Sequence, residues 1–489
     1  MRIPVLSDYN KLSQPPRRFL VFSACNVLSW FSLVGPVLVL FGRKIDMPAS
    51  WIGYLISFMP LSMILVLATI PLVTRLGSKK LMITTWVLRN LVASAVFLIP
   101  WAMHVHGART AWIVLLAAVL GFCIVRSMGV GGWFPWLHEV VPEKEQGRFF
   151  STEMALAQLC IVLVTLAQAF ILQGDPGISR FLFIYGFGIA AGLLSAVWLA
   201  RVPGGHATYD PSTQTSSLAT YATAFRDRPY IYFVATTALC FSCFAWVNSS
   251  IVLYMRDALG FADTPIMVIM AAGNLSVLLT IHFWGRFADH SGMGQASLLA
   301  MIGHSIAALV YLLLPPDASW SVWLLPPTLI ATSLLSAAYW TLSHRHMISI
   351  VDKENKVGYT NIWILGTAVS MGVTPILAGY IIEHFGLAGF RVAFAMAGVL
   401  GIIAGLANYW VVHDRKPLRH ALDELINPTL PIRTLARIAW ITAGLHDSKR
   451  ETEKEAASWA SAGRSADFPV RNKGRLMLTK AACASIWKE

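Results

Sequence analysis

The sequence predicts an all-helical membrane protein whose chain crosses the lipid bilayer twelve times. Twelve apolar stretches of roughly 20 residues follow one another along the 489-residue chain, and a helix of that length spans the hydrocarbon core of about 30 Å. The composition agrees, because 56% of the residues are hydrophobic, 13% are charged and the mean hydropathy is +0.61. These values differ strongly from those of soluble domains, so no large soluble domain is expected.

The twelve predicted spans form two groups of six. The first group is Phe19–Phe41, Trp51–Val73, Leu81–Trp101, Thr110–Trp133, Phe150–Leu172 and Phe181–Ala200. The second group is Tyr230–Tyr254, Ile266–Phe283, Ala296–Leu314, Trp323–Leu342, Tyr359–Ile382 and Val392–Val412. Because proline lacks an amide hydrogen, we expect Pro36 to interrupt the first span, and Pro326 and Pro327 to interrupt the tenth. The alternative is that the spans merely tolerate these prolines.

The basic residues orient the predicted bundle. Of the 38 Lys and Arg residues, 30 fall in the termini and the even-numbered loops, 6 in the odd-numbered loops and 2 inside spans. Positive residues remain on the cytosolic side of a membrane, so both termini are predicted to be cytosolic. The sequence pI of about 9.6 is therefore a signature of topology, and we expect no nucleic-acid partner.

The two groups of spans are related by an internal repeat. Around the end of the first span the chain reads VLFGR, up to Arg43, and around the end of the seventh it reads VLYMR, up to Arg256. The fourth span is followed by VVPEKEQGRF and the tenth by IVDKENKVGY, with a similar offset. A duplicated six-span unit is typical of proteins that enclose a central binding site between two halves.

Polar segments complete the predicted domain organisation. We expect a cytosolic tail at 1–18, a six-helix half at 19–200, a cytosolic linker at 201–229, a second half at 230–412 and a cytosolic tail at 413–489. The linker is rich in Gly, Ser, Thr and Pro and lacks apolar periodicity. In the tail, residues 430–445 form a candidate interfacial helix, which suits either the anionic inner leaflet or the bundle surface.

The loops after the second, fourth and eighth spans resemble those of the major facilitator superfamily. The loop after the eighth span reads GRFADHSG, with Gly285, Asp289 and Gly292, and the loop after the second span keeps Arg75 and Gly77. The loop after the fourth span, VVPEKEQGRF, is similar to the acid, Pro and Gly-Arg pattern of the same family. The resemblance implies a transporter with alternating access, in which these five residues form gating loops.

Only three Asp, Glu, Lys or Arg residues fall inside the predicted spans, namely Arg89, Arg126 and Glu153. An arginine at the centre of a span costs about 2.5 to 3.5 kcal/mol, so a compensating interaction is expected. Arg126 is the candidate for binding substrate or coupling ion, with a structural bond as the alternative. For Arg89 we expect snorkelling or a structural bond to another helix. Glu153 is either the group that carries protons or a carboxylate that the helix dipole stabilises.

Neutral polar and aromatic residues supply the remaining substrate candidates. They are Asn26, Trp30, Gln158, Trp246, Asn248, Asn274, Tyr339, Trp340 and Asn361. Packing and interfacial anchoring are the alternative roles of the aromatic residues. The six cysteines and the histidines form no metal-ligand pattern, so neither metal nor cofactor is expected.

The predicted function is secondary active transport of a small neutral or anionic solute, with coupling to protons or to the gradient of the solute itself. A cation exporter would need an acid in the middle of the membrane, and the spans offer none there. The alternative is a non-transporting sensor or assembly scaffold that acts through its cytosolic tail. No catalytic motif indicates an enzyme. We expect a multi-pass monomer in the plasma membrane, which would be the inner membrane of a bacterial cell.

Overall fold

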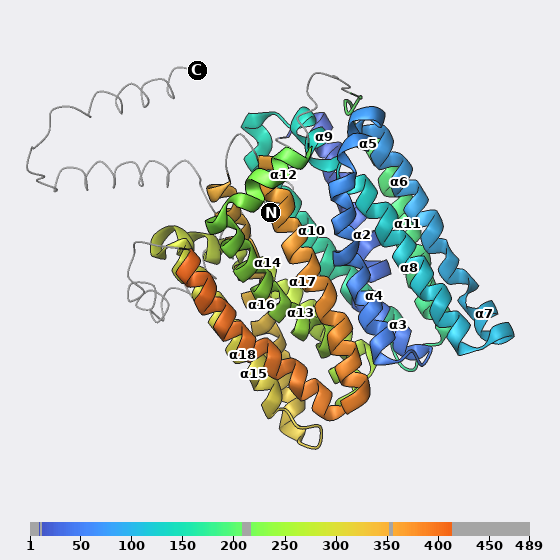
Figure 1. Cartoon of the computed structure of the whole chain (residues 1–489). Coiled ribbons are helices and arrows are strands. Elements are labelled where there is room, and N and C mark those ends of the chain that lie inside the picture. The colour runs from blue at the N-terminus through green and yellow to red at the C-terminus, as the bar shows by residue number, and fades with distance from the viewer. Residues whose placement is uncertain (1–8, 10–11, 208–216, 352–355, 413–489) are drawn as a thin grey trace, which may run out of the picture. The chain divides into compact units, whose positions relative to one another are not determined.

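In the computed structural model, all regular secondary structure of the described residues is helical (Figure 1). It describes residue 9 and residues 12–207, 217–351 and 356–412, and within these residues no strand is formed. The predicted interfacial helix at 430–445 lies outside the described residues.

The first half consists of helices that follow the predicted spans, with several internal breaks. They are α2 (Gln14–Val34), α3 (Pro36–Lys44), α4 (Ala49–Ser62), the 3-10 helix η1 (Met63–Ala68), α5 (Ile70–Leu76), α6 (Ser78–Ala93), η2 (Ser94–Leu98), α7 (Ile99–His106), α8 (Ala108–Val130), α9 (Trp133–Val140), α10 (Glu143–Ile171) and α11 (Ile178–Ala200). In Figure 1 these helices run from blue to teal.

The second half begins with a helix inside the predicted linker. Its elements are α12 (Ser217–Arg226), α13 (Arg228–Leu253), the π-helical turn η4 (Tyr254–Ala258), α14 (Asp263–Ser291), α15 (Met293–Val310), the 3-10 helix η5 (Tyr311–Leu313), α16 (Ser319–Ile350), α17 (Lys356–Phe385) and α18 (Leu387–Val411). Sequence reasoning anticipated no regular structure for the residues that form α12.

The chain is a multi-pass membrane protein. Eleven helices in the described residues are long and apolar enough to cross a bilayer, and the shorter apolar stretch Asp263–Leu278 of α14 coincides with the remaining predicted span. The break between α2 and α3 at Gly35, directly before Pro36, confirms the predicted interruption of the first span. The predicted interruption of the tenth span is wrong, because α16 continues through Pro326 and Pro327. Proline keeps a helical φ, so the helix continues there without two of its backbone hydrogen bonds.

The two halves meet along two helix pairs, α4 with α17 and α10 with α14. Glycines allow the backbones of α4 and α17 to touch, since a Cβ atom placed on Gly379 would lie 2.6 Å from the carbonyl oxygen of Ala49. Gly53 similarly faces the carbonyl group of Pro375. These contacts are closer than any larger residue allows, so they fix the spacing of the two halves.

Candidate functional site

Helix α2 presents three polar side chains to three different neighbouring helices. Ser23 contacts α10, Asn26 contacts α6, and the ring of Trp30 lies near the arginine of α8. Residues three and four apart share one helix face, so Ser23, Asn26 and Trp30 form a continuous stripe. Three of the residues predicted from sequence, Asn26, Trp30 and Arg126, are thereby brought together, with Glu153 at the end of the stripe.

Arg89 is completely buried, with 0% of its surface exposed. Its Nη2 donates a hydrogen bond of 2.7 Å to Oδ1 of Asn26. The guanidinium carbon lies 4.3 Å from the ring centroid of Trp86 and 5.1 Å from that of Phe122, and Nε and Nη1 have no hydrogen-bond partner. Arg89 therefore forms an interhelical bond and does not snorkel to the headgroups.

The orientation of the Asn26 amide follows from its two donors. Nη2 of Arg89 and Nε1 of Trp86, at 3.1 Å, both donate to the same atom. Neither donor can accept a hydrogen bond, so this atom is the amide oxygen. The amide nitrogen of Asn26 consequently offers its two hydrogens on the other side.

Arg126 on α8 is partly buried and contacts sulfur atoms in place of an acid. Its Nη1 lies 3.8 Å from Sδ of Met59 and 3.6 Å from Sδ of Met63, and thioethers are weak acceptors. The guanidinium carbon is 6.0 Å from the ring centroid of Trp30. Nε of Arg126 and Nε1 of Trp30 are both buried without a hydrogen-bond partner.

The two arginines belong to one cluster. Arg89 packs against Phe122, which lies one helical turn before Arg126 on α8. Within the part of the chain that the structure describes, neither forms an ion pair. Two positive charges inside a membrane bundle without a counter-charge are expensive, since each unpaired buried ion costs several kcal/mol. The cluster of Arg89 and Arg126 therefore requires a partner that is negatively charged or rich in hydrogen-bond acceptors.

Glu153 lies ten residues after Glu143, the first residue of α10. This is about 15 Å along the helix, too far for the N-terminal dipole to stabilise its carboxylate. The dipole alternative is therefore wrong, because α10 begins earlier than the predicted span. Oε1 of Glu153 accepts a 2.9 Å hydrogen bond from Oγ of Ser23, which places the carboxyl group beside the polar stripe of α2.

The remaining substrate candidates do not join this cluster. Gln158 is partly buried on α10, and the amide nitrogen of Asn274 donates to its own helix at Met270. Asn248 is exposed and Asn361 is buried on α17. The aromatic residues Trp246 and Tyr339 belong to two separate hydrophobic clusters, while Trp340 is 44% exposed and packs against Phe241.

The loop after the second span is fixed by a segment that sequence reasoning missed. Gly77 has a φ of 78°, and a Cβ atom there would lie 2.7 Å from the amide nitrogen of Ala207, so only glycine fits. The amide of Lys79 donates to the carbonyl oxygen of Gly205 at 2.9 Å, and Oε2 of Glu139 accepts from the amide of Gly205 at 2.8 Å. The chain directly after α11 thus ties together the loops after the second and fourth spans.

The other predicted gating residues lie at or near the ends of α5 and α14. Arg75 is exposed near the end of α5, and Gly292 has a φ of 102° at the end of α14. Gly285 and Asp289 lie in the last turns of α14, and their surroundings are outside what the structure describes.

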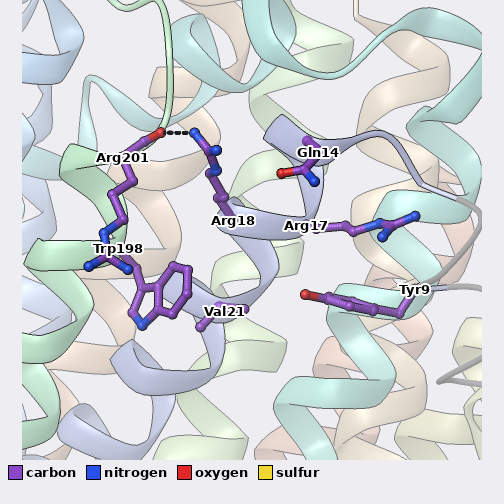
Figure 2. Close-up of a pocket in the computed structure, with 7 residues that line it drawn as sticks. All are labelled: Tyr9, Gln14, Arg17, Arg18, Val21, Trp198 and Arg201. Carbon is purple, nitrogen blue, oxygen red and sulfur yellow. Dashed lines mark hydrogen bonds between the residues drawn. The ribbon is translucent and has the colours of Figure 1, made fainter.

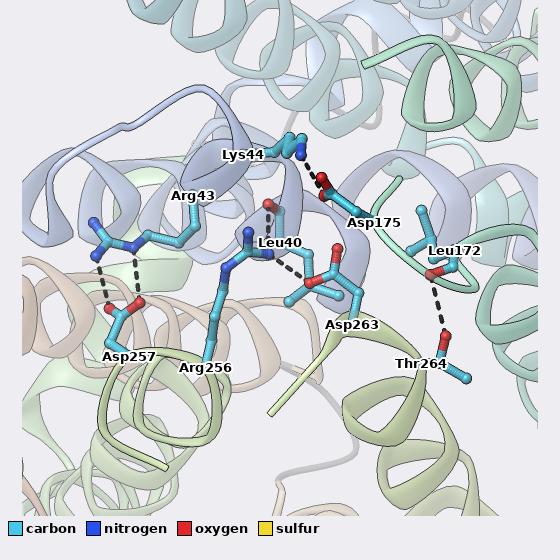
Figure 3. A network of polar contacts seen from close by, with 9 residues as sticks. All are labelled: Leu40, Arg43, Lys44, Leu172, Asp175, Arg256, Asp257, Asp263 and Thr264. Atoms are coloured by element: carbon cyan, nitrogen blue, oxygen red, sulfur yellow. Dashed lines mark hydrogen bonds and ion pairs between the residues drawn. The ribbon is translucent and has the colours of Figure 1, made fainter. Parts of the chain in front are cut away.

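Polar contacts join the two halves at one end of the bundle, shown in Figure 3. We call this end of the bundle the outer end, because it is predicted to face the exterior. It comprises residues 40–54, 169–175, 254–264 and 380–383. Arg43 binds Asp257 through two contacts, of 3.1 Å and 3.0 Å. The repeat partner Arg256 contacts Asp263 at 2.5 Å and the carbonyl oxygen of Leu40 at 3.4 Å.

Further contacts close the outer end. Oγ1 of Thr264 donates to the carbonyl oxygen of Leu172 at 3.1 Å (Figure 3), and the amide of Ser50 donates to Oε2 of Glu383 at 2.9 Å. The hydroxyl groups of Tyr54 and Tyr380 share a hydrogen bond of 2.9 Å. These contacts link helices of the first half to helices of the second.

One ion pair at the outer end stays within the first half. Nζ of Lys44 lies 2.7 Å from Oδ1 of Asp175. The hydrogen bond and the positive charge of Lys44 hold the pKa of Asp175 below its ordinary value. Asp175 is therefore ionised at neutral pH, and protonation removes the pair only under strongly acidic conditions.

A separate cavity of about 450 Å³ lies where α2 begins and α11 ends. It is lined by Tyr9, Gln14, Arg17, Arg18, Val21, Trp198 and Arg201 (Figure 2). Nη1 of Arg18 donates to the carbonyl oxygen of Arg201 at 2.6 Å. The cavity belongs to the predicted cytosolic face and is far along α2 from the buried arginines.

Comparison with known proteins agrees with this architecture. The sequence profile described as Major Facilitator Superfamily matches residues 19–335 and 234–445. None of the curated proteins matches the chain.

Solved structures similar to the chain are transporters, and the similarity concerns the fold. A mutant of the nucleoside transporter NupG is 11% identical with a TM-score of 0.64, and the match covers 82% of this chain and 100% of that one. A bacterial homologue of the iron transporter ferroportin, in an inward-facing state, is 10% identical with a TM-score of 0.65, over 84% and 99% of the two chains. A bacterial homologue of the lysosomal transporter Spinster, inward-facing and unoccupied, is 15% identical with a TM-score of 0.57, over 84% and 98%.

Proposed function

Because the chain belongs to the major facilitator superfamily, we propose that it is a secondary active transporter of a small anionic or neutral solute. The substrate site is the polar stripe of α2 together with Arg126. Transport proceeds by alternating access, in which the two six-helix halves open the site to one side of the membrane at a time.

The observation that carries this proposal is the uncompensated charge of Arg126. Its guanidinium group meets only methionine sulfurs and the ring of Trp30 among the described residues. A structural arginine in a bundle normally binds a carboxylate or several carbonyl groups, because bare burial is costly. A transported anion supplies the missing partner during each cycle, and a neutral solute rich in oxygen acceptors supplies part of it.

The outer-end contacts support alternating access. Arg43 with Asp257, and Ser50 with Glu383, each connect the two halves. Their geometry corresponds to a conformation closed toward the predicted exterior and suited to exchange with the cytosol. Opening the exterior requires these contacts to break, so their strength sets the balance between the two conformations.

Glu153 is the candidate for proton coupling. Its carboxyl group contacts Ser23, one helical turn from Asn26. Protonation changes the local charge by one unit beside the arginine cluster, which alters the affinity for an anion. Coupling to protons, or to the gradient of the solute itself, drives net movement across the plasma membrane.

Uptake into proteoliposomes tests the proposal. The purified protein is reconstituted and offered labelled anionic, neutral and cationic metabolites of similar size. Saturable uptake of anions or neutral solutes is expected, with none of cations. Uptake confined to cations contradicts the charge argument, and absence of uptake across all three classes contradicts transport.

A further inference from the structure

We propose that the solute is a small oxyanion with two negative charges, a dicarboxylate or a phosphate monoester, and that Arg89 is the positioning residue that selects the second charge. This inference rests on the proposed function, since it names the substrate class of the same site.

The groups of the cluster that have no hydrogen-bond partner are donors. Nε of Arg126 and Nε1 of Trp30 are buried and have no partner, and Asn26 turns its amide nitrogen away from its two donors. A buried donor without an acceptor costs about 1 to 3 kcal/mol. A ligand that satisfies all three groups must bring several acceptor oxygens, as carboxylates and phosphates do.

The charge of the cluster indicates a dianion over a monoanion. Arg89 packs against Phe122, one helical turn from Arg126 on α8, and neither arginine has an ion pair among the described residues. When Glu153 is protonated, one negative charge leaves one of the two cations uncompensated, while two negative charges neutralise both. In a medium of low polarity this second interaction remains strong at separations where water would screen it.

The two arginines have different roles because they differ in access. Arg126 is partly exposed, whereas Arg89 is 0% exposed and is enclosed by Trp86 and Phe122. The ligand therefore contacts Arg126, Trp30 and Asn26 directly. Arg89 acts through Asn26, whose amide it orients, and through its charge.

Calorimetric titration of the purified full chain tests the proposal with a matched series of probes. Succinate carries two charges, succinamate one and succinamide none, at nearly constant size, and glycerol 3-phosphate represents the phosphate class. The wild type is expected to bind succinate or glycerol 3-phosphate at least about tenfold tighter than succinamate, a difference of about 1.4 kcal/mol. Which dianion binds more tightly assigns the class.

Variants separate charge selection from structural support. Arg89→Met is expected to remove the preference for the dianion, so that succinate and succinamate bind alike, and Arg89→Lys is expected to restore it. Trp86→Phe is the matched control: it removes the other hydrogen bond to Asn26 and keeps the charge, so the preference remains. Equal loss of affinity for both probes in Arg89→Met means a merely structural role and overturns the inference.

The outcome also distinguishes this inference from the proposed function. Tighter binding of succinamide than of succinate, with uptake into proteoliposomes intact, overturns the dianion assignment and leaves transport standing. Binding of none of the four probes by protein that melts at the wild-type temperature overturns the dianion assignment as well. Failure of transport itself appears only as absence of uptake for every class of solute.

Discussion

Neutralising Asp257 should open the outer end of the protein. Asp257 lies at the end of the seventh predicted span, in the second half, and binds Arg43 of the first half. The variant Asp257→Asn keeps the shape of the side chain and removes its charge. If the ion pair holds the two halves together, the variant shifts the conformational balance toward the state open to the exterior.

The magnitude follows from the geometry of the pair. Two contacts of 3.1 Å and 3.0 Å join the groups, and the side chains are 28% and 23% exposed. Bidentate arginine–carboxylate pairs are stronger than single contacts, while partial exposure and salt screening weaken them. We take the net contribution as about 1 to 2 kcal/mol, which corresponds to roughly a five- to thirtyfold change in the ratio of conformations.

Labelling of an introduced cysteine measures this ratio. Thr264→Cys replaces a partly buried residue that contacts Ala169 and Leu172 across the two halves, so its thiol becomes more accessible when the outer end opens. A membrane-impermeant maleimide should label it roughly five to thirty times faster with Asp257→Asn. The charge swap Arg43→Asp with Asp257→Arg should return the rate toward the original value.

The ion pair within the first half provides the matched control. Asp175→Asn removes an aspartate at the same end of the molecule, but its partner Lys44 belongs to the same half. Labelling should therefore stay at the starting rate. Two results would refute the idea that the Arg43–Asp257 pair closes the outer end. One is an equal labelling rate with and without Asp257→Asn in the Thr264→Cys protein, and the other is an equal increase in labelling rate in Asp175→Asn.

Three further predictions concern packing, coupling and the tail. Gly379→Val should lower the free energy of unfolding by about 1 to 3 kcal/mol, because the added side chain separates α4 from α17. Gly186→Ala should leave it unchanged, since a Cβ atom there lies 3.5 Å from its nearest neighbour. Equal melting temperatures of the two variants would contradict this account of the packing. Glu153→Gln should abolish the response of uptake to an imposed pH gradient while solute binding persists, and a retained response would exclude this carboxyl group from coupling. A chain truncated after Val412 should keep uptake in proteoliposomes, because all residues of the proposed site precede the tail. Loss of a cellular function with uptake intact would favour the scaffold alternative.

The fold could be predicted from the sequence because the bilayer restricts the choices. Backbone groups in hydrocarbon must be paired within a helix, so each apolar stretch of sufficient length is a span. Hydropathy carries no comparable information about helix breaks. Pro36 ends a helix next to Gly35, whereas Pro326 and Pro327 lie within the continuous helix α16.

The candidate site was predicted only in part. A charge inside a span is conspicuous in any sequence, so Arg126 and Arg89 could be found without a structure. Their partners could not, because a helix turn of uncertainty in orientation decides whether Asn26 faces Arg89 or lipid. The spacing of Asn26 and Trp30, four residues apart, was the one available signal that they share a face.

The contacts at the outer end were missed for a different reason. Asp257 lies in the π-helical turn η4 and Asp263 is the first residue of α14. Acids are common at such helix ends and indicate no partner. The pairing of Asp257 with Arg43 depends on how the two halves meet, which local sequence does not encode. The repeat that aligns Arg43 with Arg256 could have drawn attention to these two arginines.

The most direct test of the central claim is the shift in melting temperature that ligands cause in the wild type, Arg126→Ala and Arg109→Ala. Arg109 is an exposed arginine on the same helix, so its replacement controls for loss of a positive charge. An anionic ligand at 100 times its Kd should stabilise the wild type and Arg109→Ala by about 2.7 kcal/mol, and Arg126→Ala should show no shift at an unchanged starting temperature. Equal anion shifts in all three proteins, or shifts caused by cations alone, would contradict a binding site built on Arg126.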